Sequence, residues 1–230
     1  MGVGDERIAT VIGSMEDPTT PERIVKAAVD RFGKIDVLVG GYQLFSIPQT
    51  NKTPPQINNA GQTGKLEKYE PNAIEVCDLL YAVNFRSVAL LTKLAMPHLI
   101  ATKGNVVNVS SISADFAFPT DDLFYCSLKA ALNHFSRVSA NLYGPQGVRV
   151  NVVSPGPVET RILDPSRGVK PIMSANLTQW AAKNTVLGRI GHTSETSTVL
   201  TFLASEDARY VTGAELVVDG GALVKGPSLT

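Results

Sequence analysis

The sequence has little cysteine and no excess of charge of either sign. Its two cysteines, Cys77 and Cys126, lie in helix-like segments and lack the CxxC spacing of a metal site. We interpret them as reduced thiols, which indicates an intracellular, cytoplasmic protein without a bound metal. The 21 basic and 21 acidic side chains balance, and no dense basic run occurs. The charge distribution is therefore not that of a nucleic-acid-binding surface.

Long apolar runs are also missing. No stretch of 18 apolar residues occurs, so no membrane span is expected. Residues 1–7 do not have the apolar core of a signal peptide. Apolar residues still make up 43% of the 230 residues, which is enough for a sizeable core. We expect a single domain over residues 1–230.

Short β-branched segments alternate with segments of helical periodicity. Strands are expected at residues 7–12, 35–39, 105–109, 148–153 and 216–218, and helices at 21–32, 71–99 (two in succession), 123–143, 174–182 and 196–203. This alternation predicts an α/β fold, a doubly wound parallel sheet with helices on both faces. Two stretches break the pattern: 40–57, with three prolines, is an expected irregular insertion, and 161–187 is an expected substrate-side region.

Tyr125 and Lys129 are the first chemically suggestive pair. On a helix, residues four apart share one face at a distance of about 6 Å. A lysine charge beside a phenol in a partly dry pocket favours the phenolate and lowers the pKa of the tyrosine, which is near 10 in water. Such a phenol can exchange a proton with a hydroxyl or carbonyl group. Taken alone, the same spacing is more often a solvated pair.

Polar residues also follow two of the expected strands. Ser110 and Ser111 end the strand at 105–109, and the segment Ser154–Thr160 ends the strand at 148–153. In open α/β sheets, ligands bind beyond the carboxyl ends of the strands. A serine there can donate a hydrogen bond to a substrate oxygen. The alternative is that the serine caps a turn, a role that Ser110 would suit, and that the second segment is simply a turn.

Together these motifs resemble the short-chain dehydrogenase/reductase family. Asn-Val-Ser-Ser, then Tyr-x-x-x-Lys, then Asn-Val-Val-Ser-Pro-Gly follow one another in the family's order. The C-terminal motif Val211–Gly221 (VTGAELVVDGG) and Asn84 in Tyr-Ala-Val-Asn-Phe also match. The resemblance covers residues 5–39 and 58–224. It implies a Rossmann-like sheet, NAD or NADP as cofactor, a small alcohol or carbonyl substrate, and a homo-oligomer, either a dimer or a tetramer.

The resemblance also implies roles for individual residues. Tyr125 would be the general acid/base, Ser111 would polarise the substrate oxygen, and Lys129 would lower the tyrosine pKa and bind the nicotinamide ribose. Asn84 would hold a water that relays protons to Lys129. The cofactor would be contacted by Tyr125, Lys129 and a further set: Asn58, Ala60, Gly61, Pro155, Gly156, Val158 and Thr160. The Ser111–Tyr125 spacing is one residue longer than the family's commonest spacing, so Ser110 remains an alternative to Ser111.

Two departures from the family pattern affect the cofactor site. The glycine-rich turn TGxxxGxG, which binds the pyrophosphate, is absent, and so are the first two strands of the family's order 3-2-1-4-5-6-7. We therefore expect an incomplete N-terminus, weakened cofactor binding, the strand at 35–39 at the sheet edge, and the strand at 7–12 either paired with it or poorly docked. Removing residues 40–57 restores IDVLVNNAG, so the segment is either read-through of an intron or variant exon, or a genuine loop.

These observations favour one function and leave one alternative. The resemblance implies an oxidoreductase that interconverts a secondary alcohol and a carbonyl by hydride transfer, with a tyrosine handling the proton. The alternative is a catalytically impaired or inactive, truncated isoform that keeps only the association surfaces of the fold, at residues 71–99 and 123–143.

Overall fold

The protein forms one parallel five-stranded sheet. The computed structural model describes residues 8–40, 56–58, 72–116, 123–160 and 172–225. The strands are β1 (Val37–Gly40), β2 (Gln56–Asn58), β3 (Asn105–Val109), β4 (Arg149–Pro155) and β5 (Glu215–Val218). Their order across the sheet is β2-β1-β3-β4-β5, and each neighbouring pair is parallel. The predicted doubly wound α/β architecture is confirmed.

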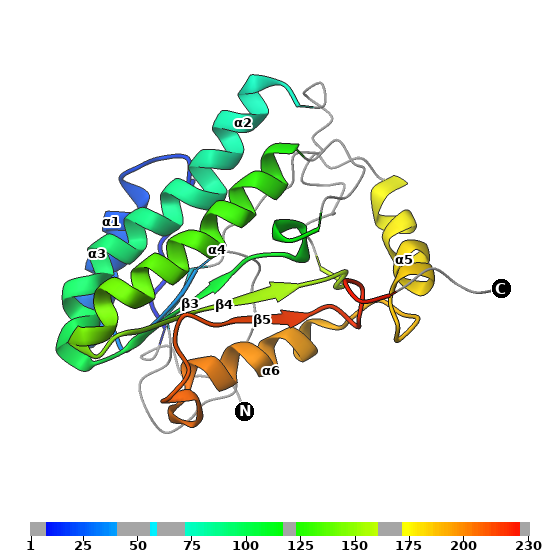
Figure 1. Cartoon of the computed structure of the whole chain (residues 1–230). Coiled ribbons are helices and arrows are strands. Elements are labelled where there is room, and N and C mark those ends of the chain that lie inside the picture. The colour runs from blue at the N-terminus through cyan, green and yellow to red at the C-terminus, as the bar shows by residue number, and fades with distance from the viewer. Residues whose placement is uncertain (1–7, 41–55, 59–71, 117–122, 161–171, 226–230) are drawn as a thin grey trace.

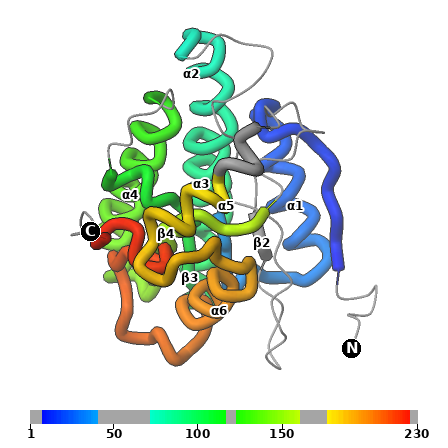
Figure 2. Tube along the Cα trace, turned by 90° about the vertical axis from the view of Figure 1, so that its right-hand side faces the viewer, coloured from blue at the N-terminus to red at the C-terminus, as the bar shows by residue number. Residues whose placement is uncertain are grey.

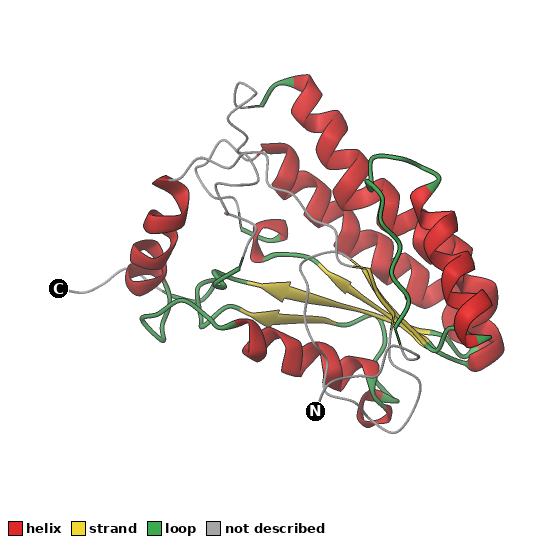
Figure 3. Cartoon of the chain, turned by 180° about the vertical axis from the view of Figure 1, so that it is seen from behind, coloured by secondary structure: helices red, strands yellow, loops and turns green. Residues whose placement is uncertain are grey.

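Helices cover both faces of this sheet. The chain contains α1 (Thr20–Phe32), α2 (Ile74–Leu80), α3 (Ser87–Thr102), α4 (Leu123–Tyr143), α5 (Ile172–Asn184) and α6 (Thr193–Ala204). Helices α1, α3 and α4 lie on one face and α6 on the other, while α5 lies beyond the carboxyl ends of β4 and β5 (Figures 1 and 3). Among the described helices, α5 thus lies outside the two helical layers, at the carboxyl ends of the strands.

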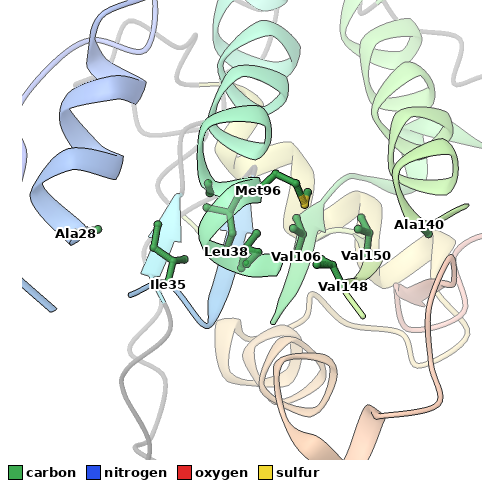
Figure 4. Packing of buried hydrophobic residues seen from close by; sticks show 10 residues of the cluster. Ala28, Ile35, Leu38, Met96, Val106, Ala140, Val148 and Val150 are labelled. Atoms are coloured by element: carbon green, nitrogen blue, oxygen red, sulfur yellow. The ribbon is translucent and has the colours of Figure 1, made fainter. Parts of the chain in front are cut away.

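The alternation of side chains along each strand builds two apolar layers. Leu38, Val106 and Val150 point to the face of α1, α3 and α4, where they pack with Met96 and Leu99 (Figure 4). Strand side chains at alternate positions point the opposite way and pack against Leu200 and Leu203 of α6. They form a second cluster: Val37, Val39, Val107, Val109 and Val153. Helices cover both faces, which explains why every residue of β1 and β3 is buried.

The strand predicted at 7–12 is not formed over the described residues, which fits the alternative that this segment is poorly docked and not the one that it pairs with β1. Residues 8–14 adopt no regular structure, and Ile8 and Ile12 are 51% and 86% exposed. This segment runs alongside α1, where Arg23 donates to the carbonyl of Ile12 at 2.9 Å (Figure 2). An apolar, β-branched run needs a strand partner to be a strand, and this segment has none in the described chain.

The prediction that the strand at 35–39 lies at the edge of the sheet was also wrong. The backbone of Gln56–Asn58 pairs in parallel with β1, in the register Leu38↔Gln56 to Gly40↔Asn58. The end of the segment predicted as an irregular insertion over 40–57 is therefore a strand, and β1 lies between two neighbours. Residues 41–55 lie outside the described part of the chain.

The remaining helices and strands follow the predictions, except that two predicted helices form one continuous helical path. The bounds of β3 and α4 are those expected, and the bounds of β4, β5, α1, α5 and α6 differ from the prediction by one to three residues. The expected pair of helices over 71–99 is instead one unbroken helical path from Ile74 to Thr102. Its middle, Tyr81–Arg86, is a π-helix. Wide π-turns inside α-helices are rare and occur frequently at functional sites.

Candidate active site

The carboxyl ends of β3 and β4 lie side by side. Val109 is paired with Val153, and the amide of Ser110 continues the ladder by donating to the carbonyl of Val153 at 2.7 Å. The serine-containing turn and the Pro155–Gly156 turn therefore leave the sheet at the same edge. This is the part of an open α/β sheet where ligands bind.

Helix α4 carries Tyr125 and Lys129 onto that edge. Its buried residues recur at helical spacing on one face, which packs on the sheet, and the two side chains belong to this face: Tyr125, Lys129, Leu132, Asn133, Ser136, Ser139 and Ala140. Lys129 is fully buried and Tyr125 is 8% exposed. The Lys129 Nζ lies 5.7 Å from the centroid of the Tyr125 ring, within the range of a cation–π contact. The solvated-pair alternative is thus excluded.

Burial determines the charge state of Lys129. Its Nζ donates to the carbonyl of Val109 at 3.0 Å. Removal from water disfavours the ammonium form and lowers the pKa of Lys129 to about 7. The amine can therefore gain or lose a proton near neutral pH, which an exposed lysine does not do.

Asn84 lies in the π-helix that packs against α4. Its side chain is completely buried. The segment Tyr81–Arg86 contacts α4, and Phe85 meets Phe135 of α4 edge-on at 5.9 Å between ring centroids. The wider turn thus places a buried amide in a segment that contacts the helix carrying Tyr125 and Lys129.

The two adjacent serines have different partners. Ser110 is 2% exposed, and its hydroxyl donates to the backbone carbonyl of Lys129 at 3.2 Å. Ser111 accepts from the amide of Ser113 at 3.1 Å and begins the short 3-10 turn η3 (Ile112–Ala114). The turn-capping role suggested for Ser110 was therefore wrong, because Ser111 is the cap. Ser111 is also the more exposed of the two, so it is the one that a substrate could reach.

The turn that follows β4 packs closely against the end of β5. Gly156 donates to the carbonyl of Val218 at 2.9 Å, and a Cβ at this glycine would lie 2.7 Å from the Cα of Asp219. A side chain there would force the two strand ends apart. Val158 forms an isolated bridge with Gly191, and Thr160 follows at intermediate exposure. A cleft of about 230 Å³ borders Val158, between the end of β5 and the start of α6.

The other predicted cofactor residues are placed only in part. Pro155 ends β4, and Asn58 ends β2, where its backbone pairs with Gly40. Ala60 and Gly61 lie outside the described residues. The described ranges contain no group of three or more His, Cys, Asp or Glu side chains suited to a metal ion. Nor does any helix within them have the length and apolarity needed to cross a membrane.

Comparison with known proteins identifies the family. A family profile described as "Enoyl-(Acyl carrier protein) reductase" matches residues 54–222. A short-chain dehydrogenase/reductase of unknown function from Caenorhabditis elegans, solved with cofactor, is 31% identical with a TM-score of 0.78; the match covers 97% of this chain and 79% of that one. The chain belongs to the short-chain dehydrogenase/reductase family. Its fold is accordingly the family's Rossmann-like sheet.

Curated relatives of this short-chain dehydrogenase/reductase are longer than the matched region. The 2-(R)-hydroxypropyl-CoM dehydrogenase of Xanthobacter autotrophicus is 31% identical over 94% of this chain and 78% of its own length. An uncharacterized oxidoreductase of Bacillus subtilis is 35% identical over 72% of this chain. The matched region spans 61% of that Bacillus protein.

One polar cluster near the site was not predicted. Glu215, Ser154, Asn133 and Asp115 meet on the α4 face of the sheet, although they are distant from one another in the sequence. No local signal marks such a cluster. The alternation along β5 does place Glu215 on the α4 face, but it does not indicate a partner.

Proposed function

We propose that this short-chain dehydrogenase/reductase interconverts a secondary alcohol and a carbonyl compound with NAD or NADP, and that Tyr125 is its general acid/base. The observation that supports this most directly is the buried Lys129 ammonium against the Tyr125 ring, beside the strand end that bears Ser111. The relative named as a hydroxypropyl-CoM dehydrogenase supports an alcohol as the substrate class.

The described residues suit the nicotinamide half of a dinucleotide. A buried ammonium with a pKa of about 7 is a hydrogen-bond donor that can bind ribose hydroxyls at this edge. Pro155, Gly156, Val158 and Thr160 follow the neighbouring strand end and would face the nicotinamide. When bound, the dinucleotide supplies or accepts the hydride.

The residues of the chain would handle the proton and the substrate. Tyr125 gives its phenolic proton to the substrate oxygen during carbonyl reduction and takes it back during alcohol oxidation. The charge of Lys129 favours the phenolate form. Ser111 donates a hydrogen bond to the same substrate oxygen. Asn84 is buried beside α4, where a bound water could connect it to Lys129.

A second candidate is an impaired chain that keeps the fold and loses most of its cofactor affinity. The observation that favours it is that these 230 residues contain no TGxxxGxG motif, together with the lack of a strand at residues 8–14. Charge-assisted hydrogen bonds to a pyrophosphate contribute about 1.5–3 kcal/mol each. Losing two of them lowers affinity by about 10²–10⁴-fold.

Titration of NADH and NADPH fluorescence distinguishes these candidates. We expect the 230-residue chain to bind about 10²–10⁴-fold more weakly than a version with the family's N-terminal strand–turn–helix–strand added and residues 40–57 removed. Both proteins are then assayed with secondary alcohols and ketones by the absorbance of the reduced nicotinamide. Equal affinity of the two proteins would contradict the impaired-chain candidate. Lack of turnover by both with every alcohol and ketone tested would contradict the proposed reaction.

We also propose that the chain is a homo-oligomer that associates through α2, α3 and α4. Apolar side chains remain exposed on α2 and α4, among them Ile74 at 64%, Val138 at 52% and Leu142 at 58%. Light scattering should give the mass of a dimer or tetramer, and Leu142→Glu should reduce it. A monomer mass for the unmodified chain at micromolar concentration would refute this association.

A further inference from the structure

The carboxylate of Glu215 on β5 has several polar partners on neighbouring elements. It accepts from the Asn133 amide of α4 at 2.7 Å and from the Ser154 hydroxyl of β4 at 2.5 Å. The guanidinium of Arg137, one turn further along α4, lies 3.7 Å from its second oxygen. The Glu215 side chain is only 16% exposed. It is thus fixed to two elements that also carry the proposed active site.

A second carboxyl group completes the cluster from the direction of the proposed active site. Asp115, which ends the turn η3, is hydrogen-bonded to Glu215. Two carboxyl groups can share a hydrogen bond only while one of them holds a proton, because an ionised carboxylate has no donor. This contact therefore requires at least one proton on the pair and is lost when both groups are ionised.

The turn η3 links this pair to Ser111. Ser111 caps the beginning of the turn through the amide of Ser113, and the amide of Asp115 closes its end by donating to Ile112 at 3.1 Å. Beyond its internal hydrogen bonds, the far end of the turn is held by the contact with Glu215. Movement of Asp115 would be passed through three residues to Ser111.

We propose that Glu215 is a positioning residue, which holds the Ser111 turn in place through a proton shared with Asp115. The effect of Glu215 on substrate orientation rests on the function proposed for Ser111. Its effect on the position of the turn is independent of that function. Glu215 would connect the turn to α4 through Asn133, which lies one helical turn after Lys129.

The charges around the pair determine the direction of its pH dependence. Burial raises the pKa of Glu215, the Ser154 hydrogen bond opposes this, and Asp115 raises the pKa further. The facing groups are Asp115 from the turn, Arg137 and Asn133 from α4, and Ser154 from β4. Because the pKa of Glu215 is raised above its ordinary value of 4.5, the pair keeps its shared proton at pH values where an exposed glutamate is already ionised. When the pH rises above this raised pKa, the proton is lost and the two carboxylates repel. The turn should therefore loosen with rising pH.

Amide hydrogen exchange of residues 113–116 tests this without cofactor or substrate. Protection factors, corrected for intrinsic rates, would be compared at pH 5 and pH 8. In the unmodified chain we expect protection to fall by about five- to tenfold at the higher pH, as for the loss of one hydrogen bond. Glu215→Gln and Asp115→Asn each supply a permanent donor and should keep protection at both values. Asp115→Ala should reduce it at both.

Glu75→Gln, on an exposed residue of α2, is the matched control and should behave like the unmodified chain. Equal protection in Asp115→Ala and the unmodified chain would overturn the proposal. So would the same pH response in Glu215→Gln as in the unmodified chain. If the protein also turns over an alcohol, Glu215→Gln should flatten the decline of kcat/KM toward high pH. Absence of turnover would count against the proposed function, whereas the exchange result would stand.

Discussion

Replacement of Tyr125 by phenylalanine is expected to lower kcat by about 10²–10⁴-fold, which is the contribution of a positioned general acid/base. The substitution removes only the hydroxyl. The ring remains in the cluster formed by Val76 and Leu80 on α2, so the packing is kept. The free energy of unfolding should change by about 1 kcal/mol, the contribution of a single hydrogen bond. Cofactor affinity should stay within about fivefold, since at most one such contact is lost.

The matched control is Tyr210→Phe, because Tyr210 is fully exposed and remote from α4 in the sequence. Initial rates with the best alcohol substrate, together with a nicotinamide fluorescence titration, separate chemistry from binding. A Tyr125→Phe enzyme with more than a tenth of the original kcat would assign the proton transfer to another group.

Replacement of Lys129 by methionine is expected to abolish turnover and yet to stabilise the fold below pH 7. The unfolded lysine holds its proton up to its ordinary pKa of 10.5, whereas the buried one holds it only up to about 7. Between these values the unfolded chain binds more protons, so the stability of the unmodified protein rises with pH. A shift of this size corresponds to about 4–5 kcal/mol, all of it a cost of burying the charge below pH 7.

Methionine removes that cost but leaves the carbonyl of Val109 without its donor, which costs about 1–3 kcal/mol. The net gain should therefore be about 1–4 kcal/mol at pH 6 and should become a loss at pH 10. Urea denaturation at both pH values measures the difference. Lys93→Met, on an exposed residue of α3, should show no such pH-dependent difference. A Lys129→Met gain that is equal at pH 6 and pH 10 would show that Lys129 titrates normally.

Local patterns were sufficient where a segment is long or buried on both faces. The periodicity of α4 predicted both of its ends, and the short valine-rich segment of β3 predicted that strand. The alternation of strands and helices predicted a parallel sheet, whereas the order of β1, β3, β4 and β5 in it was implied by the family resemblance. They failed at residues 8–14, because strand propensity does not reveal whether a pairing partner is present. They also missed the π-helix around Asn84, which depends on how the helix packs against α4.

The sequence by itself determined the family, the alternation of strands and helices that makes the sheet parallel, and Tyr125 and Lys129 as one pair on a helical face. It did so because motifs, helical spacing and the alternation of elements are written in consecutive residues. Only the tertiary structure decided that Lys129 is dry, that Ser111 rather than Ser110 caps its turn, and that Asp115 meets Glu215. Burial and hydrogen bonding between distant segments depend on which surfaces the folded chain brings together, and no short stretch of sequence contains that information.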